Sequence, residues 1–317
     1  MRAISQDEFG GPEVLREVQV PRPEPLPTEV LVRVVSAGLN PVDAKTRAGA
    51  GMSGVLGKPP FILGWDVSGV VEEIGFGVNT LKVGDEVYGM PWFPRQAGAF
   101  AEYVTAPSRQ FTHKPSTVDH DRAAAVPLAA LTAWQVLHDA AHIQAGQRVL
   151  IHAAAGGVGH FAVQFAKNAG AYVIGTASAA KHDWLRKIGA DEVIDYRTTR
   201  FEDKASDLDV VVDLLGDDVD QTSTRSMETL RAGGTLVAVP SGVSPELIER
   251  AATRGLTAKA FLVEPDGPAL AKIARLIDAG QVEIEVEQVF ALAAAAAAHE
   301  RMESGRTQGK LVLRVTT

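Results

Sequence analysis

Arg148-Val-Leu-Ile-His-Ala-Ala-Ala-Gly-Gly-Val-Gly-His160 joins a short apolar run to a cluster of glycines, and Phe161-Ala-Val-Gln-Phe-Ala-Lys167 follows directly. This order predicts a strand, a tight turn and a helix. In such a turn, backbone N–H groups and the helix N-terminus can approach a pyrophosphate, which the helix dipole also favours. Gly156 and Gly159 fit the second and third glycines of the G-x-G-x-x-G pattern, and Ala154 stands at the first. A glycine-rich turn without a ligand gives the same short pattern, so the rest of the chain must supply the context.

Length and composition exclude several kinds of protein. The 317 residues are enough for about two domains. The net charge is -8 and the Lys and Arg residues are scattered, so neither nucleic acid nor an anionic membrane is expected as a partner. The absence of cysteine excludes disulfides, thiolate zinc sites, iron–sulfur clusters and a cysteine nucleophile. The first residues form no apolar signal segment, and no apolar run reaches the roughly 18 residues of a membrane span, so a cytoplasmic protein is expected.

The two ends of the chain differ from its middle in the pattern of strands, turns and helices that their sequences predict. Alternating strands are expected at 30–35 and 67–74 and a further strand at 83–89, among many turns, which favours a compact barrel-like domain over residues 1–121. Beyond Asp119, helices are expected at 121–127 and 131–137. The segment 263–317 is expected to hold helices at 268–279 and 293–298, with the stretch 282–289 between them, and a strand at 310–315. The last of these strands is expected to return to the first domain.

Strands and helices alternate through the middle of the chain. Strands are expected at 148–152, 172–176, 192–195, 209–215 and 234–239, with helices at 158–169, 181–188 and about 221–230. Nearly all-apolar strands separated by helices of ordinary length predict a parallel sheet covered on both faces. The fold class is therefore α/β, with a doubly wound parallel sheet over 122–262 that gives the glycine turn its context.

Several motifs in a fixed order support a more specific identification. They are Ala37-Gly-Leu-Asn-Pro-Val-Asp43, Ile62-Leu-Gly-Trp-Asp-Val-Ser-Gly-Val-Val71, Gly98-Ala-Phe-Ala-Glu-Tyr-Val104, the turn at 154–159 and Glu303-Ser-Gly-Arg-Thr-Gln-Gly-Lys-Leu-Val-Leu313. Through them the chain resembles the medium-chain dehydrogenase/reductase superfamily, and within it the zinc-free quinone oxidoreductases. The resemblance implies a GroES-like β-rich substrate domain over 1–121 and 263–317, interrupted by a Rossmann domain over 122–262.

The same resemblance shows which residues stand where the zinc alcohol dehydrogenases bind their metal. Asn40 replaces the cysteine of A-G-x-C-x-x-D, Trp65 replaces the histidine of G-H-E, and the third position falls near Leu128. The lobe for structural zinc is replaced by the short connection 91–98. His138 and His142 are four residues apart but have no third ligand near them in sequence. No metal site is therefore expected.

Loss of a Lewis acid restricts the substrate. Only hydrogen bonds would then stabilise developing negative charge, so unactivated carbonyls should react poorly. Quinones and α,β-unsaturated carbonyls are already electrophilic and can accept hydride from a nicotinamide with positioning and desolvation alone. The proton can come from solvent.

The choice of nicotinamide cofactor depends on the end of the second strand. An Asp or Glu there would hold the ribose 2′-OH of NAD, but no acid precedes Asp183. Ser178 and Lys181 offer a hydroxyl and a cation for a 2′-phosphate, and Tyr196 matches a family tyrosine near the adenosine end. The alternative is that Ser178 only caps the next helix and that Lys181 is solvated. NADPH is the predicted cofactor.

The remaining site residues come from the resemblance and from the rule that ligands gather at the carboxyl ends of parallel strands. Asn40 and Thr132 are expected at the reacting end of the site, with catalytic roles. Asp43 and Asp66 fit functional or structural roles equally well. The residues expected to bind the cofactor are Ala154, Gly156, Gly157, Val158, Gly159, Ser178, Lys181, Tyr196, Leu215, Gly216, Val239, Ser241, Phe261 and Lys310.

These observations predict an NADPH-dependent, metal-free reductase of quinones or activated enones. One alternative is an enoyl-thioester reductase, but Arg47, Lys58 and Arg95 form no obvious basic rim for a carrier phosphate. Another is a protein that binds NADPH without turnover, in a structural, crystallin-like or redox-sensing role. A homodimer is expected, paired through the strand edge near 256–263.

Overall fold

The computed structural model describes residues 1–239 and 242–316, and the chain divides into two compact units. The first comprises Met1–Leu131, Glu264–Gly280 and Ile284–Thr317, and the second comprises Thr132–Val263 and Gln281–Glu283. The first unit thus extends beyond the predicted boundary at 121, because helix α3 (His120–Ala124) packs against the sheet of the first unit. Among the described residues, no helix is both long and apolar enough to cross a bilayer.

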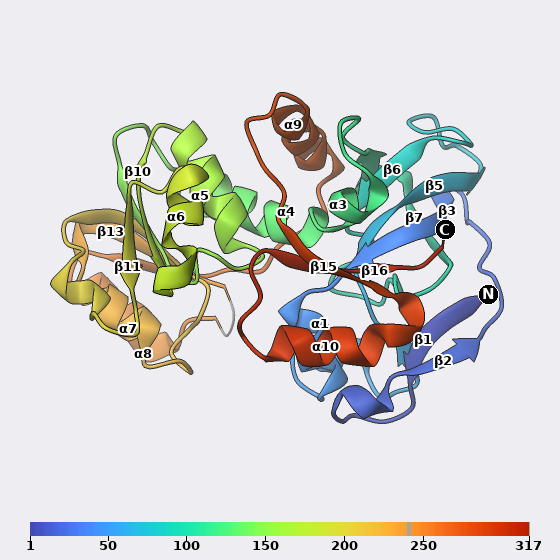
Figure 1. Ribbon diagram of the computed structural model, residues 1–317, viewed down its shortest axis with the longest axis horizontal. Helices are drawn as coiled ribbons and strands as arrows, with labels where there is room; N and C mark the ends of the chain where they lie inside the picture. Colours follow the sequence, from blue (N-terminus) through green and yellow to red (C-terminus); the bar gives the residue numbers. More distant parts are fainter. Residues whose placement is uncertain (240–241, 317) are drawn as a thin grey trace. The chain divides into compact units, whose positions relative to one another are not determined.

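A mainly antiparallel sheet forms the centre of the first unit. Its strands are β15 (Val286–Ala291), β16 (Lys310–Arg314), β3 (Glu29–Gly38), β5 (Asp66–Ile74), β6 (Glu86–Gly89) and β8 (Phe111–His113) in that order, with β7 (Tyr103–Pro107) also paired to β3. β16 runs antiparallel to β3, so the red and blue ends of the chain lie side by side in Figure 1. The expected return of this strand to the first domain is confirmed.

A small sheet and several short helices complete the first unit. The sheet has the order β2 (Arg16–Gln19), β1 (Arg2–Gln6) and β4 (Phe61–Ile62). The helices are α1 (Pro41–Arg47), α2 (Ser53–Leu56), α3, α9 (Gly267–Asp278) and α10 (Ala295–Glu303), with 3-10 turns at Pro12–Val14, Ser108–Gln110 and Leu292–Ala294. The core is mainly aliphatic, with a few phenylalanines, and includes Val30, Val32 and Val34 of β3, which alternate along the strand and are completely buried. The expected helix at 293–298 forms as α10, and it continues to Glu303.

The second unit is built on a parallel sheet. Its order is β11 (Glu192–Asp195), β10 (Tyr172–Ala177), β9 (Arg148–Ile151), β12 (Leu208–Asp213), β13 (Leu230–Ala238) and β14 (Thr257–Ala260), as expected of a doubly wound fold. The helices are α4 (Pro127–Gln135), which begins in the first unit and continues as a π-turn at Val136–Ala140, then α5 (Gly159–Asn168), α6 (His182–Lys187), α7 (Thr222–Ser226) and α8 (Pro245–Thr253), with 3-10 turns at Ala179–Lys181 and Phe201–Asp203. α8, which was not predicted, begins at Ser244, whose side chain accepts the N–H of Leu247.

Candidate functional site

The glycine turn connects β9 to α5, and it packs so closely that there is no room for a side chain at Gly159 or at Gly175 of the neighbouring strand. A Cβ on Gly159 would lie 2.3 Å from the carbonyl oxygen of Ala153. A Cβ on Gly175, in the neighbouring strand β10, would lie 2.8 Å from the Cβ of Ala154. The turn therefore lies tightly against β10, and the N-terminus of the ten-residue helix α5 follows it at the carboxyl edge of the sheet. This cradle fits a pyrophosphate held by backbone N–H groups.

The predicted cofactor residues of the second unit gather at one edge of its sheet. Each follows the carboxyl end of a strand: the turn at 154–159 follows β9, Ser178 follows β10, Tyr196 follows β11, Leu215 and Gly216 follow β12, Val239 follows β13 and Phe261 follows β14. Ser241 lies outside the described residues. Thr132 lies in α4, on the second unit's side of the division, and is buried.

The side chains after β10 and β11 form a polar group near this edge. Ser178 is buried, and its side chain makes no capping hydrogen bond to the 3-10 turn that ends at Lys181. Tyr196 is 61% exposed, and the guanidinium of Arg197 lies 5.9 Å from its ring centroid. Asp195 accepts the N–H groups of Ala179 and Arg197. Sequence reasoning passed over Arg197 and Asp195, although both flank Tyr196 in the chain.

Asp213 shapes the loop that carries Leu215 and Gly216. Its Oδ1 accepts the N–H of Leu215 at 2.8 Å and that of Gly216 at 3.1 Å, while its Oδ2 accepts the hydroxyl of Ser223 at 2.5 Å. The side chain is completely buried. Sequence reasoning missed Asp213, and the available signal was an acid at the end of an all-apolar strand.

The first unit holds a separate buried cluster around Asn40. The Nδ2 of Asn40 donates to Oδ2 of Asp66 at 2.8 Å, and its Oδ1 accepts from Nζ of Lys310 at 2.5 Å. Lys310 also donates to the carbonyl of Leu39 at 2.6 Å and lies 3.4 Å from Asp66. The other oxygen of Asp66 accepts the N–H of Leu128 at 2.7 Å. Lys310, expected to bind the cofactor, thus directs its ammonium into the interior of the first unit.

Burial shifts the ionisation of this cluster. It raises the pKa of Asp66, although Lys310 and Asn40 oppose the shift. It lowers the pKa of Lys310, against the attraction of Asp66 and Asp43. Asp43 accepts the backbone N–H of Asn40 at the start of α1, and burial raises its pKa to about 8, with the charge of Asp66 acting in the same direction. The cluster therefore holds one ammonium close to two carboxyl groups.

The positions compared with zinc ligands have other functions in the fold. Trp65 is buried, donates its indole N–H to the carbonyl of Arg95 and packs edge-on against Phe93. Leu128 is buried and binds Asp66 through its backbone. Over residues 1–239 and 242–316, no group of three or more His, Cys, Asp or Glu side chains is arranged to hold a metal ion. His142 lies beyond the π-turn with φ +51°, so it does not continue the helix face of His138.

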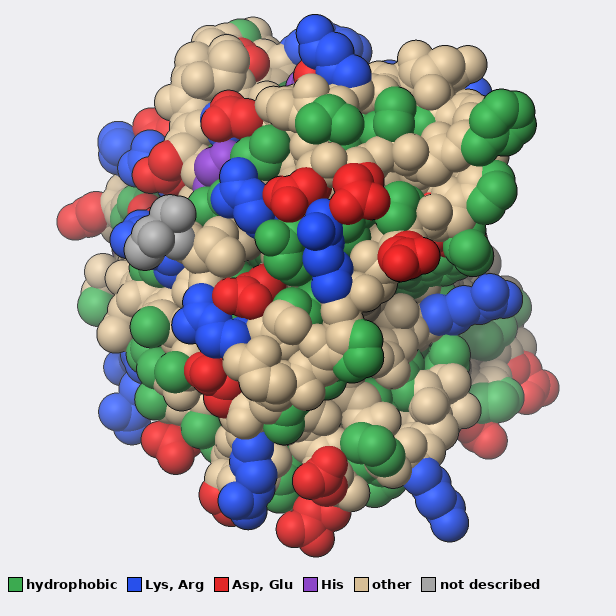
Figure 2. Space-filling view, turned by 90° about the vertical axis from the view of Figure 1, so that its right-hand side faces the viewer, with side chains coloured by type: hydrophobic (Ala, Val, Ile, Leu, Met, Phe, Trp, Pro, Cys, Tyr) green, Lys and Arg blue, Asp and Glu red, His purple; other side chains and the backbone are tan. Residues whose placement is uncertain are grey.

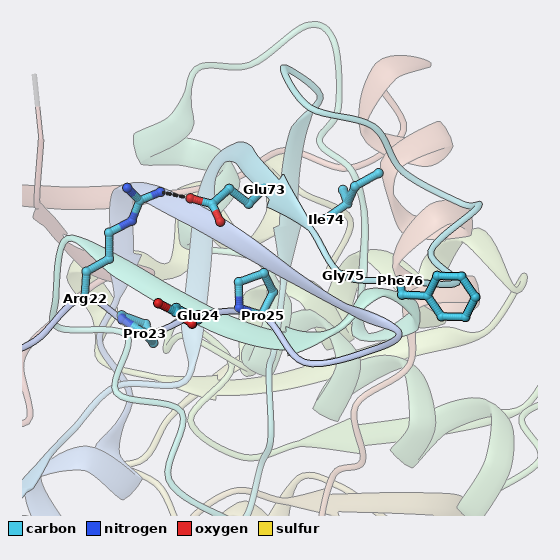
Figure 3. A pocket seen from close by; sticks show the side chains of 8 residues that line it. All are labelled: Arg22, Pro23, Glu24, Pro25, Glu73, Ile74, Gly75 and Phe76. Carbon is cyan, nitrogen blue, oxygen red and sulfur yellow. Dashed lines mark hydrogen bonds and ion pairs between the residues drawn. The ribbon is translucent and has the colours of Figure 1, made fainter.

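One face of the molecule and one surface depression were compared with the predicted site residues. On the face in Figure 2, acidic and basic side chains are interspersed rather than gathered by sign. A surface depression is lined by Arg22, Pro23, Glu24, Pro25, Glu73, Ile74, Gly75 and Phe76. In Figure 3 Arg22 reaches Glu73, to which it donates at 2.6 Å. No predicted site residue lines this depression.

Two family models match the chain. Residues 26–116 match the alcohol dehydrogenase GroES-like domain, and residues 188–313 match a family described as zinc-binding dehydrogenase. The mitochondrial NAD(P)H oxidoreductase RTN4IP1 of Homo sapiens is 33% identical over 98% of this chain and 88% of its own length. The quinone oxidoreductase of Pseudomonas aeruginosa is 35% identical over 96% of this chain and 97% of its own. The chloroplastic NADPH-dependent alkenal/one oxidoreductase of Arabidopsis thaliana is 33% identical over 99% and 79%.

Solved structures agree with these sequence relatives. The quinone oxidoreductase from Coxiella burnetii has a TM-score of 0.93 and 38% identity, covering 100% of this chain and 99% of its own. The Escherichia coli quinone oxidoreductase complexed with NADPH has a TM-score of 0.87 and 29% identity, covering 99% and 100%. Both domain types and the whole length of the chain are thus matched. The chain belongs to the quinone oxidoreductases of the medium-chain dehydrogenase/reductase superfamily.

Proposed function

We propose that this chain is an NADPH-dependent reductase of quinones and activated enones that works without a metal ion. The observation that carries the proposal is the tight glycine turn at 154–159, with Ser178 and Lys181 beyond the neighbouring strand. The second unit is the cofactor domain in this proposal, and the first is the substrate domain. Relatives named for quinones and for alkenals or enones support this substrate class, and a neighbour solved with NADPH supports the cofactor.

The second unit would hold NADPH along the carboxyl edge of its sheet. Backbone groups of the turn at 154–159 and the N-terminus of α5 would hold the pyrophosphate. Lys181 would pair with the 2′-phosphate, supported by Ser178 and by the guanidinium of Arg197. The loop at Leu215 and Gly216, fixed by Asp213, would border the cofactor further along this edge. When bound, NADPH supplies a hydride.

The first unit would stabilise the charge that develops on the acceptor. As an activated carbon receives the hydride, the electron pair of its double bond moves toward the carbonyl oxygen. An N–H of Asn40 would donate to the negative charge in the reacting complex, and a proton from water would complete the reduced product. Three residues stand where zinc alcohol dehydrogenases have their zinc ligands, and they support a reaction without zinc. Trp65 and Leu128 offer no side-chain ligand, and the oxygen of Asn40 accepts from Lys310.

Two further features concern the oligomeric state and the alternative activity as an enoyl-thioester reductase. In the described part of the chain, β14 (Thr257–Ala260) is at the end of the strand order, so its free edge supports a homodimer that pairs through it. An enoyl-thioester reductase would need a basic rim for a carrier phosphate. Arg47 cannot contribute to one, because it is buried and binds Glu303 through both terminal nitrogens.

The deciding measurement is NADPH oxidation against a panel of quinones, simple enones and enoyl-CoA esters. Turnover with quinones or enones and little with the esters is the expected result. Preference for the esters would replace the proposal with the thioester activity. Protection of the protein by NADPH against thermal unfolding, without turnover of any acceptor, would support a non-catalytic NADPH-binding protein instead.

The cofactor assignment has its own test in Lys181→Glu. Because an acid would repel the 2′-phosphate, we expect the ratio of kcat/KM for NADPH over NADH to fall at least about tenfold. Lys187→Glu is the matched control, since this exposed lysine is the last residue of α6 and pairs with Glu283. An unchanged ratio in Lys181→Glu would remove the phosphate-binding role of this residue.

A further inference from the structure

The side-chain amide of Asn40 is held at both ends. Its Oδ1 accepts from Lys310, which can only donate, and its Nδ2 donates to Asp66, whose carboxylate can only accept. Asn40 is 2% exposed, Lys310 is 3% exposed and Asp66 is completely buried. The partners therefore determine which end of the amide is the oxygen and which is the nitrogen.

The backbone around this amide is fixed as well. Asn40 is the N-cap of α1, and its own N–H donates to Asp43 at 2.7 Å. Gly38 lets the strand come close, because a Cβ there would lie 2.9 Å from Oδ2 of Asp66 and 2.3 Å from the carbonyl oxygen of Ala124. Neither the main chain nor the side chain of Asn40 can turn without breaking these contacts.

This arrangement leaves one donor of Asn40 uncommitted. The Nδ2 atom carries two hydrogens, and in the described part of the chain Asp66 is its hydrogen-bond partner for one of them. Rotation of the amide by half a turn would present Oδ1 in place of this donor. It would also set the nitrogen against the ammonium of Lys310, so the intact cluster forbids it.

We propose that Lys310 and Asp66 are positioning residues that lock the carboxamide of Asn40 in the orientation that presents its free N–H to the reacting complex. The inference rests on the proposed function for the identity of that complex. Lys310 and Asp66 act only through Asn40.

The charges of the cluster explain why both partners are needed. The charged groups that the structure brings to Asp66 are Lys310 from β16 and Asp43 from α1, while β3 and α4 contribute backbone at Gly38 and Leu128. Without the ammonium, a buried carboxylate has no compensating charge and takes up a proton. The resulting O–H of Asp66 can donate to the amide oxygen of Asn40, so the amide can rotate by half a turn.

Lys310→Met tests this sequence of events. We expect kcat for the best acceptor to fall about 10- to 100-fold, with the KM for NADPH changed less than about threefold. The remaining kcat should rise with pH, relative to the wild-type profile, as Asp66 loses its proton and again accepts from Nδ2. The side-chain ¹H–¹⁵N signals of Asn40, assigned with Asn40→Asp, should move and exchange faster with solvent. Lys114→Met, which removes an ammonium bonded to the carbonyl of Val118 in the first unit, is the control and should show none of these changes.

A wild-type kcat and unchanged Asn40 signals in folded Lys310→Met would overturn the inference. If that variant does not fold, Lys310→Met with Asp66→Leu removes the buried Lys310–Asp66 pair, and a normal kcat in this double variant would overturn it equally. If the wild-type protein turns over no acceptor, the proposed function fails. The amide signals of the Lys310 variants then decide the inference separately.

Discussion

Replacement of Asp213 by Ala should destabilise the protein and loosen the loop after β12. The carboxylate accepts three hydrogen bonds, from the N–H groups of Leu215 and Gly216 and from the hydroxyl of Ser223. The hydroxyl can rotate to another acceptor, but the two N–H groups are fixed by the backbone. Each buried donor left without a partner costs about 1–3 kcal/mol, so the free energy of unfolding should fall by about 2–6 kcal/mol.

Urea denaturation at neutral pH measures this loss, and the thermal shift produced by NADPH measures the effect on binding. Asp213→Asn retains an oxygen that can accept both N–H groups and should lose less than half as much stability. Ser223→Ala removes the hydroxyl but spares both N–H contacts, and it should keep the NADPH shift. A value for Asp213→Ala within about 0.5 kcal/mol of wild type would refute the reasoning, because it would mean that water replaces the carboxylate without cost.

Three further predictions concern activity without a metal ion, the buried His152 and the buried Arg47. EDTA should leave turnover unchanged, and dialysis followed by zinc should not raise it; loss of activity in EDTA would contradict the metal-free proposal. Burial lowers the pKa of His152 to about 4 from 6.5, so the free energy of unfolding should fall as pH drops from 6.5 to 4, where only the unfolded chain takes up the proton. Urea denaturation at both pH values should show a smaller fall in His152→Gln. Arg47→Met should lower the free energy of unfolding by about 2–3 kcal/mol, and Glu303→Gln by less, because Arg47 also binds the carbonyl of Gly10 and the ring of His299; equal losses in urea would argue against these extra contacts.

The sequence allowed the fold to be predicted where the pattern was local. The apolar strands and the glycine turn of the second unit can be recognised from short stretches of sequence. Their alternation with helices along the chain predicted the parallel sheet. Helix α8 was missed, although Ser244 and Pro245 form an ordinary helix start. Leu247 and Ala251, four residues apart, are buried on one face of α8, so the helical period was present in the sequence and was overlooked.

The candidate site was less predictable where it depends on partners distant in sequence. Ser178 and Lys181 could be assigned to the carboxyl end of a strand because they lie within a few residues of a predicted strand, and their role toward the cofactor stays a prediction. Lys310 could not, since nothing local shows that its ammonium would reach Asn40, 270 positions earlier in the chain. Arg47 was considered as part of a basic rim, but its contact with Glu303 lies 256 positions away and buries it. Such pairings follow from tertiary structure and leave no periodic signal.

The position of β16 also orders events during synthesis. A ribosome delivers this strand last among those of the first unit, so the end of β3 at Ser36–Gly38 stays unpaired on that edge while the whole parallel sheet of the second unit can already assemble. Until Lys310 is synthesised, Asp66 has no cation beside it, so burial of its carboxylate in the nascent first unit is unfavourable in free energy. The chain order therefore allows the parallel sheet of the second unit to form before the sheet of the first unit is complete, and Lys310, which bonds to Asn40, belongs to the last strand that the first unit receives.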